Sequence, residues 1–152
     1  LSQDAVFHTI KVIEKIGSMT DYFILLQPTS PLRDQNHVTA CLKTFFSSGY
    51  KSCVSVTEAE HHPWKMVLAD NDVIKPIHTL ESLEKPRQEL PKAYRVNGAI
   101  YVMPTDLFCK KRCFFADPVL PFVMENEDSF DIDTEDDLKL VEMIMKQKAA
   151  LS

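Results

Sequence analysis

The 152-residue sequence has the length of a single domain, and its composition (45% hydrophobic, 26% charged) is ordinary for a globular protein. Its formal net charge of −5 argues against non-specific binding to nucleic acid, which needs a basic face. The longest apolar run, YFILL, is far shorter than the roughly 20 residues that cross a bilayer, so we expect no membrane segment.

The first third of the sequence predicts a helix, a strand, a loop, a helix and a strand. Val6, Ile10 and Ile13 share a face at helical spacing, and Gly17 is suited to end that helix. The continuous apolar run YFILLQ then predicts a strand buried on both faces. Asp34 is expected to cap the second helix, and SCVSVT to form the next strand. This order predicts a parallel sheet with right-handed crossovers.

The loop QPTSP between the first strand and the second helix is a candidate ligand site. Pro28 and Pro31 lack backbone donors, so the strand cannot continue through them. In sheets built from such crossovers, ligands bind beyond the carboxyl ends of the strands. The position of this loop is therefore as informative as its composition.

A proline-punctuated excursion from His61 to about Lys92 follows, with a possible hairpin, KMVLADNDVIKPI, around Asn71-Asp72. Such a long excursion usually covers a site or packs on a second subunit. Its apolar hairpin would otherwise leave an exposed patch, which predicts a homodimer.

After the excursion, NGAIYVM predicts a strand, TDLFCKK a short helix and VLPFVM another strand. The sequence closes with an amphipathic helix, whose inward residues are expected to be Leu138, Val141, Ile144 and Met145.

The four cysteines, Cys41, Cys53, Cys109 and Cys113, are predicted to be reduced thiols. A chain with this many apolar residues needs no disulfide staple. The spacing in CKKRC, without a second Cys/His pair, argues against zinc. Because no secretory signal is visible either, we expect a cytoplasmic protein.

The segment SFDIDTEDD combines a candidate metal site with a helix start. In an extended segment, Asp131 and Asp133 point to one side and Ile132 to the other. Two carboxylates at about 4 Å repel each other by roughly 1–4 kcal/mol, and a divalent cation bound between them turns this repulsion into attraction. A site with oxygen ligands only favours Mg²⁺. The alternative is that Thr134 and the acids after it cap the helix, and that the whole acidic cluster is a solvated surface without a metal. A phosphatase nucleophile loop of the haloacid-dehalogenase type is rejected, because too little sequence follows for that domain.

Taken in order, LLQPTSPLR, EHHPWK, PRQELPKAYRVNGAIYV and SFDIDTEDDLKLVE resemble the bacterial CMP-sialic acid synthetases, or N-acylneuraminate cytidylyltransferases. The resemblance implies an α/β fold in three layers, with a mostly parallel, Rossmann-like sheet of the nucleotide-diphospho-sugar transferase type. It also implies a homodimer that exchanges residues 61–92 as a β-hairpin dimerisation excursion. The implied reaction joins CTP and a nine-carbon 2-keto sugar acid, N-acetylneuraminate, into CMP-sialic acid and pyrophosphate. The implied cofactor is Mg²⁺ or Mn²⁺, and neither nucleic acid nor membrane is an expected partner.

One departure from the family concerns nucleotide binding. Members of the family begin with a strand and a basic, glycine-containing loop that holds CTP, and the sequence from Leu1 onward contains no such loop. The resemblance therefore implies that residues 1–152 are the C-terminal two thirds of a single cytidylyltransferase domain. We expect this piece alone to be inactive and to expose an apolar sheet edge.

The resemblance also assigns roles to particular residues. Asp131 and Asp133 match the metal-binding pair, and Gln27 matches a residue that contacts the sugar acid from the strand end. Lys65 and Arg87 match basic residues that meet the sugar-acid carboxylate, partly from the other subunit. The remaining substrate-binding candidates that follow from the resemblance are Thr29, Ser30, Arg95, Asn97, Tyr101, Phe114 and Phe115. Of these, the last three match the lining of the sugar and its N-acyl group, although paired aromatics are more often core residues.

Two alternatives stay open at the level of the sequence. The first is a cytidylyltransferase for a related acid, pseudaminic or legionaminic, with the acyl preference decided around Phe114. The second belongs to another class: a non-catalytic module that only dimerises or binds sugar acid.

Overall fold

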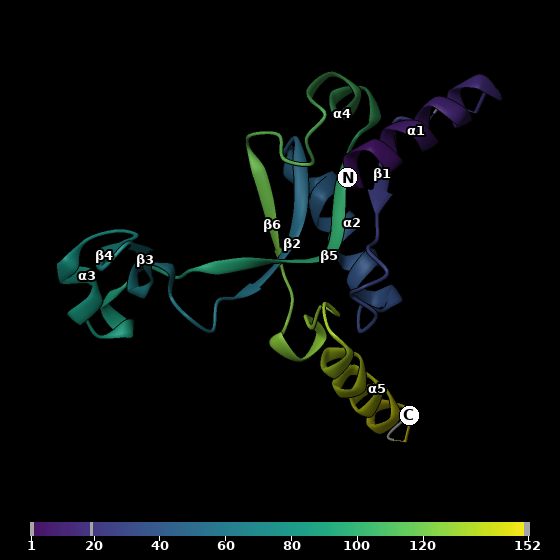
Figure 1. The fold of residues 1–152 in the computed structure, drawn as a ribbon. Coiled ribbons are helices and arrows are strands. Elements are labelled where there is room, and N and C mark those ends of the chain that lie inside the picture. The colour runs from purple at the N-terminus through teal and green to yellow at the C-terminus, as the bar shows by residue number, and fades with distance from the viewer. Residues whose placement is uncertain (1, 19, 151–152) are drawn as a thin grey trace.

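The computed structural model describes residues 2–18 and 20–150, so residues 1, 19, 151 and 152 of the predicted domain lie outside the described part. The helices and strands alternate along the chain except at the consecutive strands β2, β3 and β4 (Figure 1). They are α1 (Ser2–Lys15), β1 (Tyr22–Leu25), α2 (Gln35–Ser48), β2 (Ser52–Glu58), β3 (Val67–Asp70), β4 (Val73–Pro76), α3 (Leu80–Glu84), β5 (Tyr94–Pro104), α4 (Thr105–Lys111), β6 (Val119–Val123) and α5 (Glu135–Ala150), with short 3-10 helices at Pro63–Lys65, Arg87–Glu89 and Asn126–Asp128.

The main sheet has four described strands in the order β1-β5-β2-β6. β5 runs antiparallel to both β1 and β2, whereas β2 and β6 are parallel. β1, β2 and β6 therefore share one direction, as the alternation of helices and strands predicts. The prediction of a mostly parallel pairing is nevertheless wrong for these strands, because the reversed strand β5 lies between β1 and β2. The α/β class is confirmed, and the Rossmann-like three-layer arrangement stays a prediction.

Helices cover both faces of the sheet, and the alternating side chains of β5 pack against the helices on the two faces in turn. Tyr101 and Met103 belong to a buried cluster with Ile10 of α1 and Phe108 of α4. Ile100 and Val102 belong to a second cluster, which contains Cys41 and Phe45 of α2. The adjacent residues of one strand thus contribute to two separate cores.

The ends of α2 follow from local chemistry. The side chain of Asp34 accepts a hydrogen bond from His37 N at 2.9 Å, and the His37 ring accepts one from Asp34 N at 3.1 Å. At the other end, Gly49 adopts a left-handed conformation with φ of 72°. The predicted cap at Asp34 is therefore confirmed.

Two predictions of burial are wrong. β1 was expected to be buried on both faces, but Tyr22 is 43% and Ile24 38% exposed, because β1 is an edge strand that pairs only with β5 among the described strands. In α5, Val141 is buried as expected, whereas Leu138 and Met145 are exposed. The α5 helix extends away from the sheet, so only a narrow stripe of it is covered (Figure 1).

The excursion between β2 and β5 forms a small unit of its own that projects from the sheet (Figure 1). β3 and β4 form the predicted antiparallel hairpin, and Asn71 in its turn has a positive φ of 53°. Trp64 stacks on His78 with ring centroids 3.8 Å apart. The hairpin leaves Leu68, Val73 and Ile74 exposed, as expected of an apolar hairpin without a partner.

All four cysteines are free thiols, and the sulfur atoms of Cys41 and Cys53 lie 3.5 Å apart between α2 and β2. Among the helices that the structure describes, none is long and apolar enough to cross a membrane.

Candidate functional site

The loop that follows β1 lies against the acidic segment that precedes α5. Ile132 N donates to Thr29 O at 2.8 Å, which joins the two segments through their backbones. The hydroxyl of Ser30, which is fully buried, lies 3.2 Å from Asn97 O and 3.4 Å from Asp131 Oδ1. The structure thus brings together four residues that the sequence predicts as site residues, from three separate stretches of the chain.

Arg33 fixes the turn that carries these residues, and the sequence reasoning missed it. Ser30 N donates to Gln27 O at 3.3 Å, which closes a turn at the end of β1. One nitrogen of Arg33, Nη1, donates to Gln27 O at 3.2 Å and to Ala99 O at 2.8 Å, so it ties the turn to β5. Burial lowers the pKa of the Arg33 guanidinium. The only sequence signal was its position as the last residue of LLQPTSPLR.

Gln27 lies over a glycine of β5. Gly98 has φ of 75°, and a Cβ at this position would be 2.4 Å from Gln27 Oε1. A Cβ at this position would require the end of the Gln27 side chain to shift, so the absence of a side chain at Gly98 leaves room for the Gln27 amide in its observed position. The amide can both donate and accept hydrogen bonds, as recognition of a hydroxylated ligand requires.

Tyr101 lies close enough to Asp131 for their charges to interact. Burial, together with the nearby carboxylate of Asp131, raises the pKa of Tyr101. Tyr101 therefore stays a neutral phenol at neutral pH. Asp131 itself is half-buried and Asp133 is exposed.

The acids after Asp133 serve the start of α5, as the capping interpretation predicts. The carboxylate of Asp137 accepts hydrogen bonds from Thr134 N at 2.8 Å and from Asp133 N at 3.2 Å. In return, Asp137 N donates to Thr134 Oγ1 at 3.2 Å. The bonds from Thr134 and Asp133 lower the pKa of Asp137. Capping thus accounts for Thr134 and Asp137, and it leaves the carboxylates of Asp131 and Asp133 unexplained.

The pair Asp131 and Asp133 has the donor chemistry of a magnesium site. Within residues 2–18 and 20–150, no group of three or more His, Cys, Asp or Glu side chains could hold a metal ion. Mg²⁺ is usually bound by only one or two carboxylates, with water and substrate phosphates as the other ligands. The donor chemistry of two carboxylates from one short segment therefore fits the ion, and metal binding stays a prediction.

Below this surface lies a buried polar network that sequence reasoning also missed. Asn97 is 1% exposed, and Ser55 and Ser129 are fully buried. The amide of Asn97 bonds to both serines, at 2.6 Å and 2.8 Å. Serines inside strands and loops carry no periodic signal, so only the structure shows that they meet.

Lys65 and Arg87 lie elsewhere, in the excursion. Lys65 Nζ donates to Leu83 O at 3.1 Å, and Arg87 donates to Glu60 O at 2.9 Å and Ala59 O at 2.6 Å. Both line a pocket of about 410 Å³ together with Glu60, His61, His62 and Met66. Within one chain, none of these hydrogen bonds reaches the loop after β1. The predicted encounter of these cations with that loop across two subunits stays a prediction.

The remaining candidates divide between core and surface. Phe114 is buried and stacks on Phe108, with centroids 5.3 Å apart and planes 9° apart. Phe115 is exposed and meets the edge of Tyr101 at 6.3 Å. Arg95 donates from Nη2 to Ser129 O at 3.1 Å, so it also supports the acidic segment.

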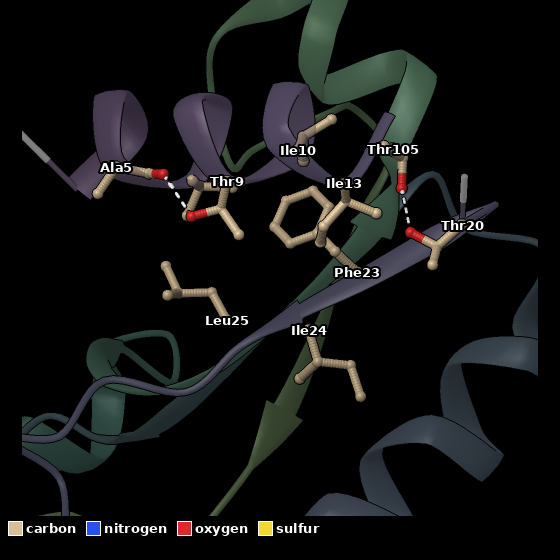
Figure 2. Close-up of a pocket in the computed structure, with 10 residues that line it drawn as sticks. Ala5, Thr9, Ile10, Ile13, Thr20, Phe23, Ile24, Leu25 and Thr105 are labelled. Carbon is tan, nitrogen blue, oxygen red and sulfur yellow. Dashed lines mark hydrogen bonds between the residues drawn. The ribbon is translucent and has the colours of Figure 1, made fainter. Parts of the chain in front are cut away.

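An apolar pocket of about 390 Å³ lies between α1 and β1 (Figure 2). It is lined by Ala5, Val6, Thr9, Ile10, Ile13, Thr20, Phe23, Ile24, Leu25 and Thr105. The lining contains no charged side chain, and the hydroxyls of Thr20 and Thr105 lie 3.5 Å from each other. It therefore has no group suited to binding a phosphate or a carboxylate, and none of the predicted site residues lies in it.

The chain is similar to several curated proteins, while no protein-family model matches it. It is 30% identical to an N-acylneuraminate cytidylyltransferase of Streptococcus agalactiae serotype V over 76% of this chain and 28% of that protein. It is also 30% identical to an N-acylneuraminate cytidylyltransferase of Escherichia coli O18:K1:H7, over 85% of this chain and 31% of that protein. A CMP-N,N'-diacetyllegionaminic acid synthase of Legionella pneumophila is 29% identical over 95% of this chain and 64% of that protein. The chain thus spans less than two thirds of the length of each of these relatives.

Proposed function

The chain is homologous to the bacterial CMP-sialic acid synthetases, and from this premise we propose that the protein is a cytidylyltransferase for a sialic-acid-type sugar. In the proposed reaction, the anomeric hydroxyl of a nine-carbon 2-keto sugar acid attacks the α-phosphate of CTP. The new bond gives the CMP-sugar, and the bond to pyrophosphate breaks. The proton of the attacking hydroxyl is released to solvent.

The meeting of the loop after β1 with the acidic segment is the observation that carries the proposal. Thr29 and Ser30 touch the segment that bears Asp131, and the charge of the same carboxylate contributes to the raised pKa of Tyr101. A hydroxylated sugar and a negatively charged phosphate chain require such a mixture of amide, hydroxyl and carboxylate groups. Phosphoryl transfer depends mainly on positioning and on compensation of charge, so these groups suit the reaction.

We assign the residues the following roles in this reaction. Asp131 and Asp133 hold Mg²⁺ or Mn²⁺, which when bound compensates charge on the phosphate oxygens. The amide of Gln27 binds hydroxyls of the sugar, and Tyr101 borders the same space. Arg87 can bind the carboxylate of the sugar acid with two parallel hydrogen bonds, and Lys65 adds a point charge.

A second copy of the chain belongs to the proposal. Lys65 and Arg87 lie on the excursion that projects from the sheet, so they reach a sugar acid at the loop after β1 only from another subunit. The exposed hairpin residues Leu68, Val73 and Ile74 supply an apolar surface for such an association. We therefore propose a homodimer that exchanges residues 61–92. A cytoplasmic location stays a prediction.

For the sugar acid we propose N-acetylneuraminate, with legionaminic or pseudaminic acid as the alternatives. The names of the relatives support a sugar acid of the sialic-acid class. They do not agree on one acid, since one relative is an N-acylneuraminate cytidylyltransferase and another is a legionaminic acid synthase. These acids differ in their acyl groups and ring substituents. The exposed ring of Phe115, beside Tyr101, is positioned to contact such a substituent.

A pyrophosphate-release assay with CTP and Mg²⁺ tests the proposal. The purified protein is given N-acetylneuraminate, legionaminic acid or pseudaminic acid, and a reaction without sugar acid serves as the control. When residues 1–152 are part of a polypeptide that also carries the nucleotide-binding loop, we expect turnover in the range of about 1–10³ s⁻¹ with one of the acids, and we expect no turnover from residues 1–152 alone. If no acid raises pyrophosphate release by the longer polypeptide above the control, the enzyme proposal is refuted. Binding of an acid without turnover would favour the non-catalytic module.

A further inference from the structure

The polar network below the site runs in one direction from the sheet to the acidic segment. Ile100 N donates to Ser55 Oγ at 2.7 Å, and Ser55 Oγ donates to Asn97 Oδ1 at 2.6 Å. Asn97 Nδ2 then donates to Ser129 Oγ at 2.8 Å, and Ser129 Oγ donates to Glu125 O at 2.7 Å. The chain of hydrogen bonds thus links β5, β2 and the loop before α5.

The orientation of the Asn97 amide is determined by its neighbours. Ala99 N also donates to Asn97 Oδ1, at 3.2 Å, so this atom must be the acceptor oxygen. The amide nitrogen consequently faces Ser129, whose hydroxyl must accept there and donate to Glu125 O. No described buried side-chain polar atom is left without a partner. A buried network in which every member is satisfied holds a single arrangement.

This network ends two residues before Asp131. Ser129 is held by Asn97 through its hydroxyl and by Arg95 through its carbonyl, at 3.1 Å. One residue beyond Asp131, Ile132 N bonds to Thr29 O at 2.8 Å. Asp131 is therefore held on both sides, and the bond between Asn97 and the Ser129 hydroxyl joins buried groups that a ligand cannot reach, whereas Arg95 is exposed.

We propose that Ser129 is a positioning residue for the carboxylate pair Asp131 and Asp133, and that it acts with Asn97 and Ser55 to set the affinity of the pair for a divalent cation. The inference rests on the proposed function, because it takes the pair to be the metal site. It gives Asn97 a positioning role in place of the predicted contact with substrate. Partners of this kind, one step removed from the ligands, typically change metal affinity by about 10–100-fold when they are removed.

The experiment measures binding of Mn²⁺ alone by the EPR signal of the free ion, with thermal unfolding of each variant in parallel. Ser129→Ala removes the hydroxyl that receives the bond from Asn97. Ser52→Ala is the matched control: Ser52 is equally buried, accepts from Ala116 N at 2.9 Å and donates to Ala116 O at 3.0 Å. Ser52 lies at the start of β2, and these bonds do not involve the acidic segment.

We expect Ser129→Ala to weaken Mn²⁺ binding about tenfold or more, and Ser52→Ala to leave it unchanged while lowering the unfolding temperature to a similar extent. Equal Mn²⁺ affinity in both variants would refute the positioning role. Should Ser129→Ala fail to fold, Ser55→Ala interrupts the same network without touching the acidic segment, and unchanged affinity there refutes it equally. If the unaltered protein binds no Mn²⁺, the metal role in the proposed function fails, and the inference falls with it.

Discussion

Gly98 shows how a single position without a side chain shapes the site. Its left-handed backbone is one that other residues adopt only with strain. A methyl group there would also meet the oxygen of Gln27 at 2.4 Å. Two separate requirements, one of conformation and one of space, therefore apply to the same residue.

Gly98→Ala is expected to raise the KM for the sugar acid about tenfold, because the Gln27 amide must move. Gly49→Ala is the matched control, since Gly49 has a similar φ of 72° and nothing within 4 Å of its added Cβ. Both variants should lose roughly 1–2 kcal/mol of stability through backbone strain. Steady-state kinetics with an unchanged KM in Gly98→Ala would show that Gln27 does not contact the sugar.

In the intact enzyme, which includes the nucleotide-binding loop, Asp133→Asn is expected to lower kcat by a factor of about 10² or more without unfolding the protein. Loss of one preorganised charge contact typically has an effect of this size. Asp136→Asn serves as the control, because Asp136 is exposed and pairs with Lys139 at 2.8 Å on the surface of α5. Rates are compared over a series of Mg²⁺ concentrations. Full activity of Asp133→Asn at ordinary Mg²⁺ would remove the metal assignment.

Sequence motifs identified the candidate site residues better than the residues that hold them in place. Ser30 and Asp131 stood out as members of distinctive motifs, and the structure brings them together. Arg33 and Ser129 belong to the same motifs, but the sequence assigned them no role, because they bond to a backbone carbonyl or a buried amide far away in the sequence. No spacing rule connects such partners, so their roles follow only from the folded arrangement.

At the scale of elements, the start of α2 offers a direct test of capping. The bond from His37 N to Asp34 lowers the pKa of the Asp34 carboxyl, which means that the folded state favours the ionised form. The resulting stability is present above the ordinary pKa of 3.8 and disappears as the pH falls through the lowered folded-state value. The contribution of this cap should therefore depend on pH in the acidic range only.

Asp34→Ala is expected to cost about 1 kcal/mol at pH 7, which lowers the unfolding temperature by about 2–4 °C for a protein of this size. Thermal unfolding followed by circular dichroism should show this difference at pH 7 and a smaller one near pH 3. Asp72→Ala, at an exposed aspartate of the β3–β4 turn, is the control and should have little effect at either pH. A difference for Asp34→Ala that stays constant between the two pH values would contradict the role of its charge.

Local signals predicted the elements well and their neighbours poorly. The helical spacing of Val6 and Ile10 and the hairpin turn at Asn71 both correspond to observed elements. The apolar run at Tyr22–Leu25 is indeed a strand, but such a run does not reveal whether the strand lies at the edge or the centre of a sheet. The insertion of β5 between β1 and β2 depends on pairing between distant segments, which no window of the sequence contains.

At the scale of the whole molecule, the excursion and the sheet face different surroundings. The sheet has helices on both faces, whereas the hairpin of β3 and β4 leaves apolar side chains on its surface. A patch of this kind is typical of an interface between proteins. The oligomeric state of the protein therefore tests whether the hairpin forms an interface.

Ile74→Asp is expected to convert the proposed homodimer into a monomer, because it places a charge in the apolar surface of the hairpin. Ile74 is 61% exposed, so the substitution should leave the fold of one chain intact. Ile16→Asp, at a residue that is 73% exposed at the end of α1, is the matched control and should stay dimeric. Sedimentation of the unaltered protein as a monomer at micromolar concentration would contradict the prediction.

The place of β5 also determines the order in which the protein can fold while it is being synthesised. β1 and β2 leave the ribosome early, yet they never pair with each other, since both pair with β5. Leu25 must wait for Tyr101, and synthesis of the intervening segment takes roughly 4–15 s at about 5–20 residues per second. During that interval β2 and the whole excursion are synthesised, while the sheet still lacks β5. The nascent chain thus exposes the apolar side chains of β1 for seconds, which is long enough for chaperones to bind them.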